Sequence, residues 1–286
     1  MNENFEQNLI KCAQQLSDVY YYYFFKKWIN WENPVDLNEK INWLSFNTNT
    51  ESWSALSDKY GVREFIKSKE LGFLLNDIYE KWDNVEDIDL TNLPTSFAIK
   101  TNCSSNDTII VQDKKYVNLF ELKKHFKKVL DKRFGIETSE PHYLRIKPCI
   151  FAEKLIGTNI NDYKVWCFNG KPYCIQIISN RHENKTMNVF DVNWNEYKDW
   201  LNPNFQNKNT IEKPKLLTEM LKYAEILSEG FPQVRVDFYI ENEHLYFSEM
   251  TFTASAGRLL SFNNKALLNM GQEIKIKNID NNKENN

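Results

Sequence analysis

Residues 234–252 constrain the fold of this chain more than any other segment. They form two β-type runs joined by a short polar turn, which is typical of a hairpin. Side chains alternate faces along a strand, so Arg235 and Asp237 share a face of the first run. Glu249 and Thr251 share a face of the second. Pairing the runs would bring Asp237 and Glu249 together, and two carboxylates beside a hydroxyl suit a hard cation such as Mg²⁺. An ordinary hairpin with a polar outer face is the alternative interpretation.

The composition limits the class of protein. The chain has 286 residues, 42% of them hydrophobic and 14% aromatic, which is enough for one large or two modest domains. A net charge of −3 gives no general indication of nucleic-acid binding. We find no apolar run of membrane-spanning length and no basic-then-apolar leader, so we expect a cytoplasmic protein. Five cysteines without CxxC spacing predict reduced thiols, and the four dispersed histidines argue against a zinc site.

The first part of the chain is predicted to be helical. Helices are expected over residues 5–30, 37–47 and 52–70. The first is rich in aromatic residues, and contact with a membrane surface is one interpretation. We favour docking on the main domain, because the aromatic run has no strong basic face beside it.

A pattern of strands begins after Pro94. Strands are expected at residues 96–102 and 107–113, followed by a helix at 119–134 and a strand at 147–157. Residues 162–181 predict a hairpin that turns at Asn169 and Gly170. A helix at about 212–229 precedes the carboxylate hairpin, and the polar end of the chain is predicted to be disordered. This order predicts an α+β architecture.

The predicted helix at 119–134 carries a basic face made of Lys123, Lys124, Lys127 and Lys128. A solvated surface is the default interpretation of such a face, and contact with an acidic substrate or a membrane surface is the alternative.

Several polar residues follow predicted strands. Lys100 enters the polar loop 102–106, whose backbone amides could cradle phosphates, although the loop has no glycine and is not a Walker A sequence. Glu153 ends a strand and could pair with an amine-bearing ring such as adenine. Asp162 is a further acidic candidate. Phosphoryl transfer also requires cations that face one cleft, and the candidates are Lys164, Arg181 and Arg235. Salt bridges at strand edges are the alternative.

Six segments in this order resemble the TupA-like family of the ATP-grasp superfamily, which is associated with teichuronopeptide and surface-polysaccharide gene clusters. They are residues 57–72, 93–102, 107–115, 150–157, 161–181 and 235–252. The most specific is the sequence NDYKVWCFNGKP in the fifth segment. The resemblance covers roughly residues 37–272.

The resemblance implies an ATP site. Its phosphates would be held by Lys59, by Lys100 and by the loop that contains Ser104 and Ser105. The segment that reads adenine would be Glu153, Lys154 and Leu155, and Asp162 would lie near the ribose.

The resemblance also implies roles in chemistry. Lys164 and Arg181 match cations that face phosphate and acyl phosphate, and Arg235 matches an arginine that steadies a tetrahedral intermediate. The Mg²⁺ ligands would be Asp237 and Glu249, with Thr251 where many relatives carry asparagine.

The chain departs from the family in two loops. The phosphate loop usually reads near NHGSG, whereas residues 102–106 read NCSSN and contain no glycine. Only glycine readily adopts positive φ, and Asn106 could tolerate such a conformation. The second difference is the segment 253–257, TASAG, where relatives more often have Pro-Gly.

The resemblance implies an ATP-grasp fold and an ATP- and Mg²⁺-dependent carboxylate–amine ligase. The implied division is a helical region at 1–88, a small lobe at 89–156, a large lobe at 157–273 and a disordered tail at 274–286. The carboxylate would belong to a small molecule or a uronic-acid-containing surface glycan, with an amine as co-substrate. The protein could associate peripherally with a glycan-assembly complex; nucleic acid is not an expected partner. A sugar or alcohol kinase on the same scaffold and a non-catalytic nucleotide-binding protein are the alternatives.

Overall fold

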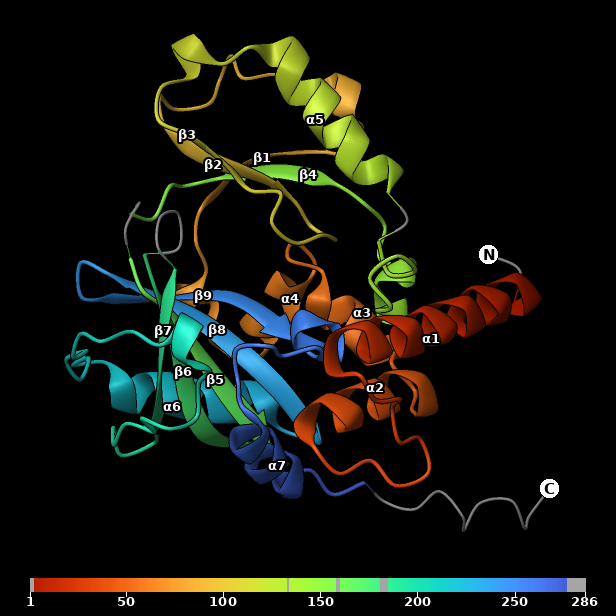
Figure 1. Ribbon diagram of the computed structural model, residues 1–286. Coiled ribbons are helices and arrows are strands. Elements are labelled where there is room, and N and C mark those ends of the chain that lie inside the picture. The colour runs from red at the N-terminus through yellow and green to blue at the C-terminus, as the bar shows by residue number, and fades with distance from the viewer. Residues whose placement is uncertain (1–2, 133, 158–159, 181–184, 277–286) are drawn as a thin grey trace.

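A computed structural model describes residues 3–132, 134–157, 160–180 and 185–276 (Figure 1). A small upper lobe and a larger lower lobe each contain an antiparallel sheet, and helices cover both, so the predicted α+β class is confirmed. Arg181 lies outside the described residues, and so does the end of the predicted tail from residue 277. No helix within the described ranges is both long and apolar enough to span a bilayer.

The chain begins with α1 (Glu3–Phe25) and α2 (Leu37–Asn47). Helix α1 packs on α2, and the Ser17 hydroxyl donates a hydrogen bond to Asn42 Oδ1 at 2.5 Å. Arg145 pairs with Glu6 at 2.7 Å, which ties α1 to the segment that enters the small sheet. The prediction that this helix docks on the main domain is therefore confirmed.

The prediction of a single helix over residues 52–70 is wrong. The structure has two short helices instead, α3 (Glu51–Ser57) and α4 (Val62–Ser68). Between them Asp58 Oδ1 accepts hydrogen bonds from the amides of Tyr60 and Gly61, a local turn that competes with continued helix. This break leaves Lys59 in the connection rather than on a helix.

The small sheet has the order β1-β4-β2-β3, made of β1 (Ile78–Trp82), β4 (Ile150–Glu153), β2 (Phe97–Thr101) and β3 (Ile109–Val111). Helix α5 (Leu119–Asp131) lies across it, on the side away from the large lobe (Figure 1). Leu122 and Phe126 of α5 are buried against the core of this lobe. The sequence did not predict β1, which falls inside the range that we assign to the helical region. The domain division remains a proposal.

The large sheet has the order β7-β6-β5-β8-β9, with β5 (Asp162–Phe168) at its centre. Its other strands are β6 (Lys171–Ser179), β7 (Thr186–Asp191), β8 (Gln233–Glu241) and β9 (His244–Thr251). The predicted β5–β6 hairpin is confirmed, and its turn residues Asn169 and Gly170 both have positive φ. Strand β7 was not predicted. Helix α6 (Leu217–Ser228) packs on β5, β6 and β8 and buries the apolar face of the sheet.

Helix α7 (Asn264–Glu273) packs against α2 and joins the end of the described chain to its start. The loop before it is sharply bent, because Ser255, Ala256 and Gly257 all have positive φ. A Cβ on Gly257 would lie 2.1 Å from Asn42 Nδ2, so the approach of this loop to α2 requires glycine. The short 3₁₀ helices are Gly72–Leu74, Val85–Asp87, Lys114–Tyr116, Pro141–Arg145, Pro203–Phe205 and Ala254–Gly257.

Candidate active site between the two lobes

The β8–β9 hairpin pairs Asp237 directly with Glu249 and Arg235 with Thr251. The register shifts between Asp237 and Phe238, where Ser248 is the extra residue on β9. Such a bulge re-aims the side chains on one side of it. Glu249 therefore lies on the same face as Asp237, toward the small lobe.

Asp237 is buried under two cations. Arg235 donates two hydrogen bonds of 2.7 Å to it, from Nε to Oδ1 and from an Nη to Oδ2. Lys164, on the neighbouring strand β5, also donates to Oδ2 and lies 3.6 Å from Asp162. Burial alone would lower the pKa of Arg235, but Asp237, Glu249 and Asp162 outweigh it and raise that pKa above its usual value. The guanidinium therefore stays charged.

Glu249 extends further toward solvent, with 29% of its side chain exposed. One oxygen accepts hydrogen bonds of 3.3 Å from Arg235 and from the Thr251 hydroxyl, and the other lies 3.8 Å from Lys59 Nζ. Burial raises the pKa of Glu249, but the nearby Lys59, Lys164 and Arg235 outweigh burial and hold it well below its usual value. The carboxylate is ionised and available to bind a cation.

The loop after β2 is held by side chains rather than by glycines. Asp107 accepts hydrogen bonds from the Thr101 amide and hydroxyl at 2.7 and 2.5 Å. Asn102 donates to Asp58 at 2.9 Å and accepts from the Cys149 amide at 2.8 Å. Asn106 has φ of 60°, so the expectation that it takes the left-handed conformation is confirmed.

Lys59 is attached to this loop from the helical side. Its amide donates to the Asn102 carbonyl at 3.0 Å, and its ammonium donates to the Ser104 carbonyl at 2.5 Å. Because the same ammonium faces Glu249, Lys59 joins the loop of the small lobe to the hairpin of the large lobe. Ser104 itself is buried, and its hydroxyl lies 2.9 Å from that of Thr101.

Lys100 and Glu153 form an ion pair of 2.6 Å across β2 and β4. The Lys100 ammonium also lies 5.3 Å from the centre of the Phe151 ring. After Glu153 the chain leaves the sheet. The Lys154 amide donates to the Asp77 carbonyl at 2.9 Å, and the Lys154 carbonyl accepts from Asn76 at 2.7 Å. The Lys154 amide and carbonyl are therefore both hydrogen-bonded within the protein at the point where the chain leaves β4.

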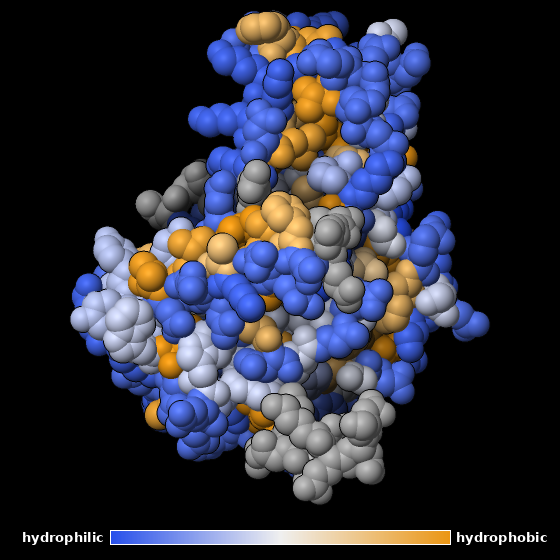
Figure 2. All heavy atoms as spheres, turned by 90° about the vertical axis from the view of Figure 1, so that its right-hand side faces the viewer, coloured by the Kyte–Doolittle hydropathy of each residue, from blue (hydrophilic) through white to orange (hydrophobic). Residues whose placement is uncertain are grey.

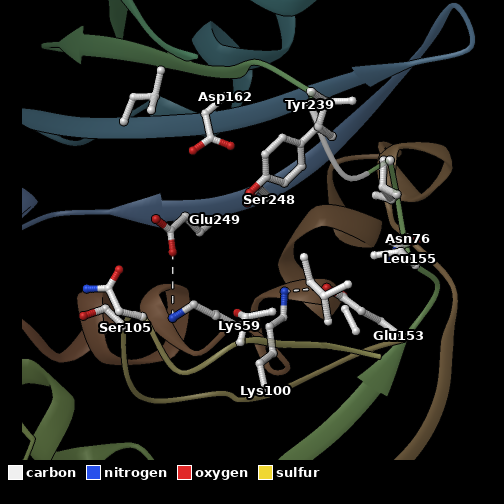
Figure 3. Close-up of a pocket in the computed structure, with 18 of the residues that line it drawn as sticks. Lys59, Asn76, Lys100, Ser105, Glu153, Leu155, Asp162, Tyr239, Ser248 and Glu249 are labelled. Carbon is white, nitrogen blue, oxygen red and sulfur yellow. Dashed lines mark ion pairs between the residues drawn. The ribbon is translucent and has the colours of Figure 1, made fainter. Parts of the chain in front are cut away.

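These elements enclose a cleft of about 440 Å³ between the lobes. Figure 3 shows Lys59 and Lys100 on one side of it and Asp162 and Glu249 on the other. Its lining includes most of the sequence-predicted residues: Lys59, Lys100, Ser105, Glu153, Lys154, Leu155, Asp162, Lys164 and Glu249. Four predicted residues do not line it: Ser104, Arg235, Asp237 and Thr251. Ser104 borders a second cavity, and the other three lie on β8 and β9 within contact of Glu249 or Lys164.

Sequence reasoning missed part of the lining. Tyr239 and Ile178 both pair in register with Asp162, from the strands on either side of β5. Period-two alternation from Asp237 would have found Tyr239. Asn76 precedes the unpredicted strand β1, and Ser248 lies at the bulge, which no sequence signal marked.

The donor chemistry of the hairpin fits a hard cation. Asp237 and Glu249 supply carboxylate oxygens and Thr251 a hydroxyl, which are the oxygen donors that Mg²⁺ prefers. Within the described residues, no group of three or more histidine, cysteine, aspartate or glutamate side chains could hold a metal. A metal here would need ligands from a bound molecule, as is usual for Mg²⁺ at phosphates.

Comparison with known families identifies the chain. The family model for TupA-like ATPgrasp matches residues 39–275. The fold is therefore that of an ATP-grasp protein. Within that superfamily the chain belongs to the TupA-like ATPgrasp family, which confirms the resemblance seen in the sequence.

Solved structures with a similar chain path have low sequence identity. D-alanine–D-alanine ligase from Bacillus anthracis, complexed with ATP, is 19% identical, with a TM-score of 0.46 over 79% of this chain and 66% of that chain. L-amino acid ligase from Bacillus licheniformis is 12% identical, with a TM-score of 0.48 over 78% of this chain and 50% of that chain. The chain thus spans half to about two thirds of their length. The comparison with curated proteins found no match.

Proposed function

We propose that the chain is an ATP-dependent carboxylate–amine ligase that forms an amide through an acyl phosphate. The observation that carries the proposal is the convergence of Lys59, Lys100 and Glu249 on one cleft, with Asp237 paired directly to Glu249 behind it. Phosphoryl transfer depends on cations and a metal that spread the charge of the transferring group.

The nucleotide would lie along the cleft. Lys59 and Lys100 would hold its phosphates, Ser105 would contribute from the loop, and Ser104 would act only through the carbonyl that orients Lys59. The Lys154 carbonyl and the Leu155 backbone would read adenine beside Glu153, with Asp162 near the ribose, since the Lys154 amide is already bound to the Asp77 carbonyl. Both lysines are ion-paired to glutamates, so phosphates would have to replace Glu249 and Glu153 as their partners.

Asp237, Glu249 and Thr251 would hold Mg²⁺. When bound, the cation would neutralise charge on the phosphate oxygens and polarise the transferring group. Lys164 and Arg235 already balance Asp237, so metal binding requires that Asp237 release part of these contacts. Glu249 is more exposed than Asp237 and is therefore the better candidate for the carboxylate that would meet the metal first.

In the proposed reaction a substrate carboxylate oxygen attacks the γ-phosphorus of ATP, and ADP leaves. The amine nitrogen then attacks the carbonyl carbon of the acyl phosphate, and the nitrogen loses a proton as phosphate leaves. Arg235 remains protonated but lies behind Asp237 and Glu249, so it would stabilise the oxyanion of the tetrahedral intermediate only after releasing part of its contacts with them. Lys164 would face the transferred phosphoryl group, and Arg181, outside the described residues, stays a candidate from the sequence.

The family's association with surface-polysaccharide clusters supports a uronic acid of a glycan or its precursor as the carboxylate, and an amino acid or amino alcohol as the amine. It also supports a cytoplasmic enzyme that associates peripherally with a glycan-assembly complex. These assignments are part of the proposal.

The test is product analysis. Incubation with ATP, Mg²⁺, uronic acids and a panel of amines should yield ADP, phosphate and an amide in equal amounts, all dependent on Glu249. A phosphorylated sugar without an amide would instead identify a kinase. Binding of ATP without turnover on any pair would favour the non-catalytic interpretation.

A further inference from the structure

Helix α5 and the residues before it form a basic segment, although the whole chain has a net charge of −3 and the neighbouring segment, which packs on α5, holds the exposed acidic residues Asp83, Glu86, Asp87 and Asp89. Residues 114–132, which contain α5, hold seven lysines and two acidic residues. Figure 2 shows the small lobe uppermost, covered mainly by hydrophilic residues with apolar atoms exposed between them. Positive charge is therefore concentrated on α5 and the residues just before it, where Glu121 and Asp131 are the exposed acidic residues.

The lysines on α5 are arranged on one face together with an aromatic ring. Phe120, Lys124, Lys127 and Lys128 follow the helical repeat and are exposed, whereas Leu122 and Phe126 point into the core. Phe120 is 71% exposed, and Tyr116, just before the helix, is 88% exposed.

The lysines of this segment differ in whether their ammonium groups are bound within the protein. Lys123 donates to the Glu86 carbonyl at 2.6 Å, and Lys114 donates to three backbone carbonyls. Both ammonium groups are therefore hydrogen-bonded within the protein. Among the described residues, Lys115, Lys127 and Lys128 form no salt bridge, and Lys124 has only a contact of 3.6 Å with Glu121. Their charges are available to an external partner.

We propose that this surface docks on an anionic lipid bilayer; we call it the α5 face, made of Lys115, Tyr116, Phe120, Lys124, Lys127 and Lys128. Lysines beside a bilayer are attracted by anionic headgroups, and aromatic side chains are favoured at the headgroup level. A soluble anionic polymer would satisfy the lysines but would leave the Phe120 ring largely in water. The combination of four lysines and two exposed aromatic rings therefore favours a membrane surface over a polyanion.

The position of the α5 face is compatible with activity at a membrane. Helix α5 lies on the side of the small sheet away from the large lobe (Figure 1), so docking there would leave the cleft open to solution. The inference concerns a surface outside the cleft and holds whether or not the chain is a ligase.

The test is flotation of the full chain with lipid vesicles. We expect binding to vesicles of phosphatidylcholine with 30% phosphatidylglycerol in 0.1 M salt, and at least tenfold weaker binding in 1 M salt or to phosphatidylcholine alone, because screening shortens the range of the attraction. Lys124→Glu, Lys127→Glu and Lys128→Glu together should abolish binding. Tyr116→Ser with Phe120→Ser should weaken it at least threefold without a change in charge.

The matched control makes the same change in net charge on the large lobe, at the exposed Lys198, Lys213 and Lys222. This triple glutamate variant should bind vesicles like the wild type, and circular dichroism should report an intact fold for every variant. Equal losses in the two triple variants would overturn the proposal, as would absence of binding to anionic vesicles. Tighter binding to polygalacturonate than to vesicles, unaffected by the aromatic substitutions, would identify a polyanion site instead and would also overturn it.

Discussion

Asp237 and Glu249 occupy directly opposed positions on β8 and β9, yet their surroundings differ. Asp237 is buried and bound by Arg235 and Lys164, whereas Glu249 lines the cleft and faces Lys59 at 3.8 Å. The Asp237 carboxylate therefore balances two buried cations, and the Glu249 carboxylate is positioned to contact a ligand in the cleft.

This difference predicts unequal effects of neutralising the two carboxylates. Glu249→Gln should lower turnover about 100-fold or more, because it removes a charge acting on the reacting group. It should also lower the unfolding free energy, but by less than the Asp237 substitution, because the ion pairs of the partly exposed Glu249 are screened by solvent. Asp237→Asn should lower turnover as much and also cost about 3 kcal/mol of unfolding free energy, since it leaves buried cations uncompensated. Steady-state kinetics and urea unfolding measure the two effects. Turnover at the wild-type rate in either variant would contradict the metal assignment.

Lys100 should matter for nucleotide binding, whereas a lysine on the basic helix should not. Lys100→Ala should weaken binding of Mg·ATP about tenfold or more, because it removes a charge-assisted contact to phosphate. Lys123→Ala is the control, because the Lys123 ammonium binds only the Glu86 carbonyl among the described contacts. Titration calorimetry compares the two. Equal losses of affinity would mean that the nucleotide lies elsewhere.

Asn106 is expected to be the conformational substitute for glycine in the phosphate loop. Asn106→Ala should cost about 1 kcal/mol of unfolding free energy, since its φ of 60° is disfavoured for alanine. Asn106→Gly should be close to neutral in stability and should keep ATP binding. Urea denaturation distinguishes them, with Ser105→Ala as the neighbouring control. A stable alanine variant would show that the left-handed conformation is not required.

Glu140 should make stability depend on pH near neutrality. Burial raises its pKa to about 7, although Thr253, Thr138 and Arg258 oppose the shift. The folded state therefore keeps a proton that the unfolded chain releases near pH 4.5, so the contribution of Glu140 to stability is fully present below that pH and is lost as pH rises through 7. The loss is on the order of 3 kcal/mol.

Glu140→Gln should remove that decline and should make the protein more stable than the wild type at pH 8. Thermal unfolding from pH 4 to pH 8 measures the difference between the two proteins. Glu64→Gln, at a side chain that is 80% exposed, provides the control and should follow the wild-type curve. Parallel pH profiles for wild type and Glu140→Gln would contradict the predicted ionisation.

Local signals explain which parts of the fold could be predicted. The turn at Asn169 and Gly170 marks the β5–β6 hairpin, and the polar turn marks the β8–β9 hairpin, although the register of each pair shifts at one bulge further along the strands. Strand β1 is short and mostly solvent-facing, and its pairing with β4 joins residues far apart in the chain. The break after α3 depends on a single Asp58 turn inside a helical pattern.

The site was predictable to a similar degree. Alternation predicted that Arg235 shares a face with Asp237 and that Glu249 shares a face with Thr251, but the bulge at Ser248 brings the two pairs to one face of the sheet. Lys59 could be assigned only through the family resemblance, because its partners, the Ser104 carbonyl and Glu249, are distant in sequence. The bulge at Ser248 also escaped prediction, since no residue type marks it.

The most direct test of the account is titration calorimetry of ATP with the wild-type chain in the presence and absence of Mg²⁺. We predict one ATP per chain, bound at least tenfold more tightly with Mg²⁺ than without it, and loss of that difference in Glu249→Gln. ATP binding that is indifferent to Mg²⁺, or a metal effect that survives the substitution of Glu249, would contradict the claim that the β8–β9 hairpin holds a magnesium–nucleotide complex.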